Sequence, residues 1–147
     1  MINENELSQI LLINNNNNFK NNKTFFGSSL KKFINKIYYK FEIPKESFII
    51  SLYYLYNFYN CIKNNKFLIS NFFDNINIHI FTCIIISLKQ IYDENLNIKY
   101  ICNLLNINFN NFTKYEIIIL KTLNWNVSYL NNDFVLFKNS VEHYMDL

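Results

Sequence analysis

Few residues of this chain have the types and spacing that enzyme or metal chemistry needs. The two histidines, His79 and His143, are isolated, and no nucleophile with a nearby base can be nominated. A lone histidine on a mostly apolar helix is usually a satisfied core or surface residue. The three cysteines, Cys61, Cys83 and Cys102, share no metal-ligand spacing. The sequence therefore predicts no catalytic residue, no metal and no cofactor, and a protein that is not an enzyme.

Two charged residues interrupt strongly apolar stretches and need an explanation. Lys89 comes directly after the run IIISL, and Glu116 lies between FTKY and IIILKTL. Burying either charge unpaired would cost several kcal/mol. Either the two groups reach solvent or pair within the fold, or they stand at an interface with another protein. The sequence leaves the structural and the functional alternative open.

The composition favours a single helical domain. The chain has 147 residues, of which 50% are hydrophobic and 17% charged, which is enough to bury one core. Because it has one Gly and one Pro, glycine-rich phosphate loops are excluded and the tight turns of all-β folds are disfavoured. Asn is abundant while Ala and Arg are absent, a bias typical of AT-rich codons. Family motifs are therefore expected to be blurred.

The charge pattern argues against nucleic-acid and membrane partners. The net charge of +3 is spread along the chain without a dense basic stripe. The most apolar run, residues 78–88, is well short of the roughly 20 residues that cross a bilayer. The opening MINENELSQI lacks the basic segment of a secretory signal. Three cysteines leave one unpaired, so we expect free thiols in a reducing compartment, the nucleus or the cytoplasm.

Apolar residues recur at three- and four-residue spacing in five stretches, which is the signature of amphipathic helices. The predicted helices are residues 30–40, 44–61, 75–92, 98–105 and 108–123. The third of them is apolar almost all round, which is typical of a central helix. Residues 63–74 are predicted to be a connection. Asn97 is the predicted N-cap of the fourth helix, and Asp133 is predicted to cap a final helical stretch.

The predicted organisation is an all-α fold in three parts. Residues 1–28 form an Asn-rich arm with a short apolar helical stripe, residues 29–130 hold the five core helices, and residues 131–147 form a C-terminal helix. Pro44 stands where the first turn of the second helix is expected. Proline suits this position because it has no N–H, and an N–H in the first turn would have no partner within the helix. Glu46 follows in that turn, where the helix macrodipole favours an anion.

Two segments resemble helices of the cyclin box, in particular the box of P/U-type cyclins. Residues 75–94 resemble its third helix, which begins with Asn and ends in a Lys followed shortly by an acidic pair. Residues 111–129 resemble its fifth helix, in which a Glu is followed by a hydrophobic run, Leu, Lys and an aromatic residue. The positions that agree with the family's pattern are Asn75, Ile76, Thr82, Lys89, Asp93, Glu94, Glu116, Leu120, Lys121, Leu123 and Trp125.

Two further stretches extend the resemblance to about residues 30–137. Residues 47–59 are similar to the second cyclin-box helix, where the family commonly carries Tyr-Leu-Asp-Arg. This chain has Tyr54, Leu55, Tyr56 and Asn57 there. It therefore lacks the Asp-Arg element and the polar network that this element would make. The family's acidic-Phe-x-x-aromatic tail is matched at Asp133, Phe134 and Phe137.

The resemblance implies a five-helix cyclin box with short N-terminal and C-terminal helical extras. It also implies a regulatory subunit that binds a cyclin-dependent protein kinase as a heterodimer and activates it. In that family the box contacts the helix and neighbouring strand of the kinase's small lobe. Carried over to this chain, Lys89 and Glu116 would meet backbone groups of the kinase helix. Leu120 and Trp125 would be the apolar anchors beside them.

Two other classes of function remain as alternatives. A helical protein-interaction module with a cyclin-box-like fold and no kinase partner would keep the charge pair as a purely structural feature. A helical DNA-binding protein is disfavoured because the lysines are not clustered. Capture of a cyclin-dependent kinase would separate the first alternative from the regulatory subunit. Salt-sensitive binding to random duplex would favour the second.

Overall fold

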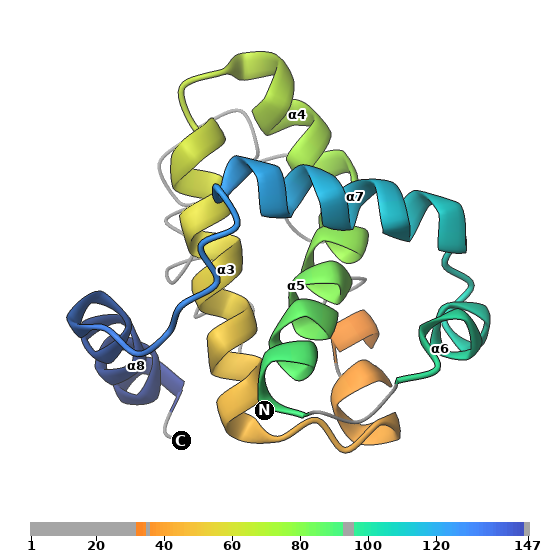
Figure 1. Cartoon of the computed structure of the whole chain (residues 1–147), viewed down its shortest axis with the longest axis horizontal. Helices are drawn as coiled ribbons and strands as arrows, with labels where there is room; N and C mark the ends of the chain where they lie inside the picture. The colour runs from red at the N-terminus through yellow and green to blue at the C-terminus, as the bar shows by residue number, and fades with distance from the viewer. Residues whose placement is uncertain (1–31, 35, 93–95, 146–147) are drawn as a thin grey trace.

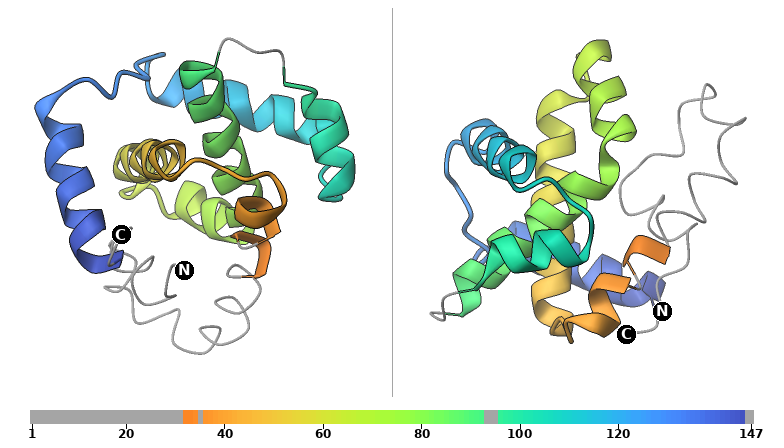
Figure 2. Two further views of the ribbon diagram at one scale, coloured as in Figure 1. Left: turned by 90° about the horizontal axis from the view of Figure 1, so that it is seen from below. Right: turned by 90° about the vertical axis from the view of Figure 1, so that its right-hand side faces the viewer.

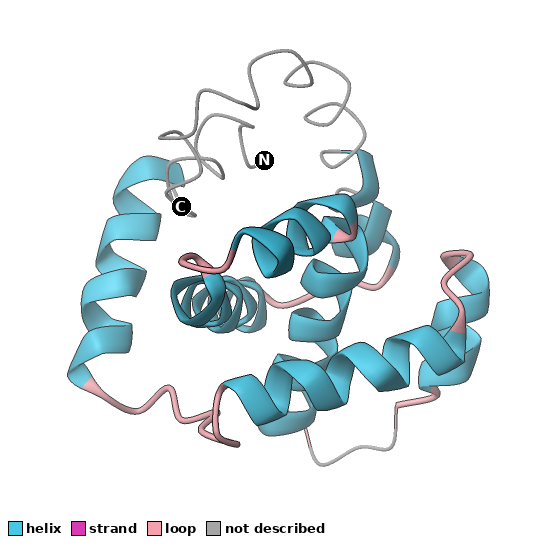
Figure 3. Cartoon of the chain, turned by 90° about the horizontal axis from the view of Figure 1, so that it is seen from above, coloured by secondary structure: helices cyan, strands magenta, loops and turns pink. Residues whose placement is uncertain are grey.

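The computed structural model describes residues 32–34, 36–92 and 96–145, which form helices and loops without a strand (Figures 1 and 3). The helices are α3 (Lys45–Ile62), α4 (Lys66–Asp74), α5 (Ile76–Ile91), α6 (Ile98–Leu104), α7 (Phe109–Thr122) and α8 (Asn132–Met145). Residues 32–34 and 36–40 are also helical. The all-α prediction is confirmed. The predicted arm, residues 1–28, lies outside the described residues.

Helix α5 is the central helix, as its apolar sequence predicts. Ile76 and every residue from His79 to Leu88 are buried. Helix α3 packs along α5, and α7 crosses both of them (Figures 1 and 2). Ile80 and Ile84 are each 1% exposed, and burial of such a side chain stabilises the fold by about 1.5–3 kcal/mol. The core of the molecule is therefore built around this one helix.

Helix α3 begins directly after Pro44, close to the predicted start. It also forms a hydrogen bond to the loop that follows α7. Pro44 is the N-cap residue, one position before the helix, and Glu46 lies in the first turn. Three turns further along, the buried Tyr54 donates a hydrogen bond from its hydroxyl to the Val127 carbonyl at 2.7 Å. This contact joins two segments that lie 73 residues apart in the sequence.

Helix α4 corrects the prediction that residues 63–74 are a connection. Asn65 begins it, because its side chain accepts a hydrogen bond from Leu68 N at 3.1 Å. Ile69, Phe72 and Phe73 are buried, which is a helical spacing. The exposed Phe67 and Leu68 hide that pattern in the sequence. Among the described residues, no single helix has the length and hydropathy to cross a membrane. Helices α4 and α5 meet both criteria only when taken together, and they are bent by 82°.

Asparagine side chains cap the N-termini of several helices. Asn97 accepts a hydrogen bond from Tyr100 N at 3.1 Å, which confirms the predicted N-cap of α6. The predicted cap at Asp133 is wrong, because Asn131 Oδ1 accepts the hydrogen bond from Phe134 N at 2.8 Å. An N-cap residue must precede the helix, whereas Asp133 already lies in the first turn of α8. Its carboxylate there still favours the helix through the macrodipole.

Asparagine also ends helices in this chain, in place of the scarce glycine. After α7, Asn124 has a φ of 51°, the left-handed conformation that glycine usually supplies. Its N–H donates to Lys121 O at 3.0 Å, and the next residue, Trp125, donates to Leu120 O at 2.7 Å. These two bonds form a Schellman motif. Asn106, with a φ of 55°, ends α6 in the same way.

Replacing Asn124 by glycine is expected to raise the free energy of unfolding by about 0.5–1 kcal/mol, because glycine adopts positive φ without a steric penalty. Asn124→Ala should lower it by a similar amount. Urea unfolding of the two variants beside the wild type measures both changes. Asn126→Gly is the control at a position without a positive φ, and it should not raise stability, because it also removes the hydrogen bond that Asn126 Oδ1 accepts from Ser128 N. A loss of stability in Asn124→Gly would contradict this account of the motif.

Helix α8 is held against α3 mainly by aromatic rings. The ring of Tyr53 lies 5.3 Å from Phe134 and 5.4 Å from Phe137, measured between ring centroids. Tyr56 of the same helix lies 5.4 Å from Phe137. Helices α8 and α6 lie at opposite ends of the molecule (Figures 1 and 2).

Candidate functional site

Lys89 and Glu116 meet at the surface between α5 and α7. Lys89 lies in the last turn of α5 and Glu116 in the middle of α7. Lys89 Nζ lies 2.5 Å from Glu116 Oε1, although 27 residues separate the two in the sequence. Their side chains are 41% and 16% exposed, respectively. The charges therefore pair with each other, and they do so at the surface and not in the core.

The packing of α7 on α5 fixes where these charges stand. The rings of Phe81 and Phe112 meet edge to face with centroids 5.5 Å apart, and both are 1% exposed. On α7, Ile119 is fully buried, one turn after Tyr115. Glu116 follows Tyr115 directly and so stands at the edge of the buried face. Lys89 is the first exposed residue after the buried run of α5.

The other two predicted site residues continue along α7 from Glu116. Leu120 lies one turn further on the same side of the helix and is partly buried. Trp125 is 61% exposed, and its N–H bond to the Leu120 carbonyl holds it at the end of α7. The structure thus places Glu116, Leu120 and Trp125 along α7 and its end, and Lys89 of α5 meets this row at Glu116. We call these four residues, together with Ile117, the α7 strip.

Ile117 belongs to the strip although sequence reasoning missed it. It is 42% exposed and lies three residues before Leu120, on the same flank of α7. In the sequence it is one of three consecutive isoleucines, of which Ile119 is buried while Ile118 is exposed on the other flank. The exposed isoleucines could be told from the buried one only by their angular position around the helix axis relative to Phe112. An exposed isoleucine beside a charge pair widens the apolar part of the surface.

The charge pair retains capacity for further hydrogen bonds. An ammonium has three N–H donors and a carboxylate has several acceptor sites. The bond from Lys89 Nζ to Glu116 Oε1 uses one of each. Within the described residues no second ion pair involves either group. A partner's main chain could therefore accept from Lys89 and donate to Glu116.

The remaining reactive side chains do not assemble into a site. Cys83 and Cys102 are buried, Cys61 is exposed, and all three are free thiols. Burial raises the pKa of the Cys83 thiol, which disfavours the reactive thiolate. The described part of the chain contains no group of three His, Cys, Asp or Glu side chains able to hold a metal ion.

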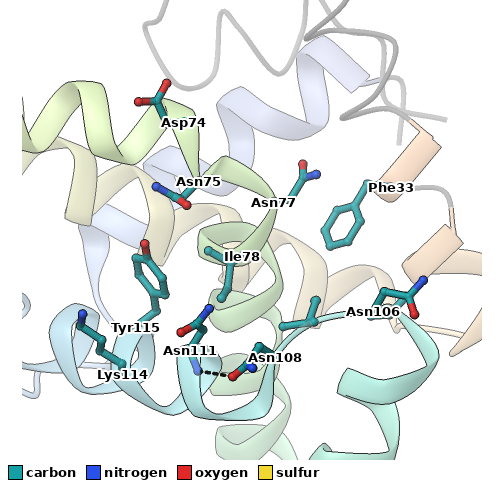
Figure 4. A pocket seen from close by; sticks show the side chains of 12 residues that line it. Phe33, Asp74, Asn75, Asn77, Ile78, Asn106, Asn108, Asn111, Lys114 and Tyr115 are labelled. Atoms are coloured by element: carbon teal, nitrogen blue, oxygen red, sulfur yellow. Dashed lines mark hydrogen bonds between the residues drawn. The ribbon is translucent and has the colours of Figure 1, made fainter.

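A cavity of about 420 Å³ opens between the N-terminal ends of α5 and α7 (Figure 4). Carboxamides make up much of its lining, from Asn75, Asn77, Asn106, Asn108 and Asn111. Figure 4 shows Phe33 pointing toward Ile78, with Lys114 and Tyr115 at the opposite end. The lining includes no histidine, cysteine or serine, and neither Lys89 nor Glu116 contributes to it. The cavity is therefore separate from the α7 strip.

Comparisons of the chain with protein-family models, curated proteins and solved structures found no match. The likeness to the cyclin box therefore rests on the sequence motifs at residues 47–59, 75–94 and 111–129.

Proposed function

We propose that the protein is a cyclin-like regulatory subunit that binds a cyclin-dependent protein kinase and activates it. The observation that carries the proposal is the α7 strip. Lys89 and Glu116 come from two separate helices and meet at the surface. The exposed Ile117 follows Glu116 directly on α7, and the exposed Trp125 stands at the end of that helix. A charge pair with apolar neighbours has the composition of a protein-binding surface whose polar contacts are shielded from water.

The strip suits recognition of another protein's main chain. Lys89 can donate to carbonyl groups at the C-terminal end of a helix, and Glu116 can accept from free N–H groups. Because such groups are present whatever side chains the partner carries, they provide affinity that does not depend on the partner's local sequence. Apolar contacts from Leu120 and Trp125 would then exclude water and strengthen the charged hydrogen bonds.

The backbone at Trp125 supports the same proposal. Its φ is 58°, and a left-handed conformation costs about 1–2 kcal/mol for a residue with a Cβ. The indole ring is also 61% exposed, so burial in this chain does not repay that cost. Strained residues of this kind cluster at binding sites, where the strain presents a side chain to a partner.

Activation follows from selective binding. A protein that binds the active arrangement of a kinase more tightly than the inactive one shifts the population toward the active arrangement. The shift is limited by the difference between the two affinities. On this proposal the protein performs no chemistry itself. Its output is a kinase in which the catalytic lysine and the helix glutamate can pair.

Co-expression with a panel of cyclin-dependent kinases tests the proposal. We expect at least one kinase to co-purify as a one-to-one complex in gel filtration and to gain activity toward a peptide substrate. Lys63→Ala, on the exposed loop between α3 and α4, is a control that should leave the complex intact. If no kinase co-purifies, the second candidate is favoured, a helical interaction module in which Lys89 and Glu116 only join α5 to α7. The bond between those two groups is the observation behind that candidate.

A further inference from the structure

His79 is enclosed by aromatic rings from three other helices. Its side chain lies on α5, and the residue is 2% exposed. The imidazole centroid lies 5.4 Å from Phe58 of α3, 5.1 Å from Phe72 of α4 and 4.9 Å from Tyr115 of α7. Nδ1 bonds the Asn75 carbonyl at 2.8 Å, and a carbonyl can only accept. Nδ1 therefore carries the proton, and Nε2 is the position that a second proton would occupy.

No acidic group faces this imidazole from the helices packed against it. The groups in contact from α3 and α4 are phenyl rings, and the group from α7 is a phenol. The nearest charged residues along those helices are Asp74 and Lys114, which are exposed, and Glu116, which pairs with Lys89. The hydrogen-bond partner of the imidazole is the carbonyl of Asn75, the residue before α5. Burial among these rings lowers the pKa of His79, and the bond to Asn75 opposes this in part.

Among the three helices around His79, α4 is the shortest, and it packs mainly on two neighbours, α3 and α5. It spans 9 residues, against 18 in α3 and 14 in α7. Its buried side chains are Ile69, Phe72 and Phe73. Phe72 contacts His79 directly, at the point where α4 and α5 meet at 82°. Elements with few buried contacts open at a lower free energy than the rest of a fold.

We propose that His79 is an acid-sensitive latch that holds α4 against the core while it is neutral and releases α4 when it binds a proton. The proton comes from water, and no covalent step is involved. An imidazolium at this position has no acidic partner in the closed arrangement, whereas detachment of α4 admits water around it. The inference depends on the fold alone and not on a kinase partner.

The direction of the pH effect follows from the two states. In the open state the imidazole regains an ordinary pKa near 6.5, and in the closed state its pKa is lower. The open state therefore binds more protons as the pH falls below about 6.5. The opening constant rises by up to tenfold per pH unit until the closed state also protonates. Between pH 7.5 and pH 5.0 the rise reaches at most about 30-fold.

Amide hydrogen exchange of the full chain at pH 7.5 and pH 5.0, corrected for the intrinsic exchange rates, tests the latch. We expect peptides from α4 to lose up to about 30-fold in protection at pH 5.0, while peptides from α5 keep theirs. His79→Gln cannot take up the proton and should show no such loss. His143→Gln removes the only other histidine of the sequence and should respond like the wild type.

Three results would overturn the latch. These are unchanged protection of α4 in the wild type, an equal loss across all helices, and a pH response that persists in His79→Gln. If His79→Gln does not fold, His79→Phe fills the aromatic enclosure without a titrating group and serves the same purpose. Proton NMR of the imidazole is an independent measurement. Titration of His79 at or above 6.5 in the folded protein would also refute the proposal.

Discussion

Lys89→Ala and Glu116→Ala are each expected to weaken the proposed kinase complex by about 2–5 kcal/mol, at least about 30-fold in Kd. The loss is large because truncating one side chain leaves the partner's buried main-chain groups without hydrogen bonds. The same changes should lower the free energy of unfolding of the isolated protein by no more than about 1 kcal/mol. An ion pair with a lysine 41% exposed is screened by water and contributes little to stability.

Calorimetric titration against the captured kinase measures the first effect, and urea unfolding measures the second. Lys45→Ala is the matched control. Lys45 pairs with Glu142 at 3.6 Å, and its exposure of 44% is close to the 41% of Lys89. The ion pair of Lys45 and Glu142 joins α3 to α8. Lys45→Ala should therefore leave kinase affinity unchanged. If Lys89→Ala unfolds the protein while affinity per folded molecule stays the same, the pair is structural.

A charge swap separates the two interpretations more sharply. Lys89→Glu combined with Glu116→Lys keeps the attraction between α5 and α7, so a purely structural pair should recover its stability. A docking pair should not recover kinase binding, because the donor and the acceptor would then face the wrong main-chain groups. Stability regained without affinity is therefore the expected result. Recovery of both would favour the structural interpretation.

Hydrophobic spacing was enough to predict the longer helices. Residues 44–61, 75–92 and 108–123 were predicted, and α3, α5 and α7 occupy almost the same ranges. Helix α4 was missed for a physical reason. Its first turn carries the exposed Phe67 and Leu68, which break the apolar stripe formed by the buried residues behind them. Only the cap at Asn65, three residues before Leu68, marked its beginning.

The abundance of asparagine was explained by codon bias, yet the fold makes specific use of it. N-caps come from Asn65, Asn97, Asn108 and Asn131, whose side chains each accept from the N–H three residues on. Asn106 and Asn124 supply the left-handed residues that end α6 and α7. Asparagine tolerates this conformation better than other residues with a Cβ. A chain with one glycine can therefore still terminate its helices.

The candidate site could be predicted only in part. The two charges stood out because each interrupts an apolar run, but no pattern in one sequence gives the angle at which two helices cross. Whether Lys89 reaches Glu116 depends on the packing of α7 over α5 through Phe81 and Phe112. The outcome also combines the two alternatives, because the pair is satisfied within the chain and yet stands at the surface. Variants at Lys89 and Glu116 distinguish the structural role from the docking role by their separate effects on stability and kinase affinity.

Phe81→Ala is expected to have the largest effect on stability, a loss of about 3–5 kcal/mol in the free energy of unfolding. Phe81 is 1% exposed on α5, and its ring meets Phe112 of α7 at 5.5 Å. Removing it deletes buried apolar surface, leaves a cavity and ends an aromatic contact. Since small domains are stable by only about 5–15 kcal/mol, the change takes a large share of the total.

Phe109→Ala is the control for this variant, because Phe109 also neighbours Phe112, at 6.2 Å, but is 38% exposed. We expect it to cost no more than about 1 kcal/mol. Urea unfolding compares the two. A small loss in Phe81→Ala would mean that α7 is not held by this contact.

If Phe81→Ala stays folded at low temperature, its kinase affinity should still fall, because the docking surface requires α7 to hold Glu116 within reach of Lys89. Unchanged affinity in that variant would show that binding does not depend on the position of α7.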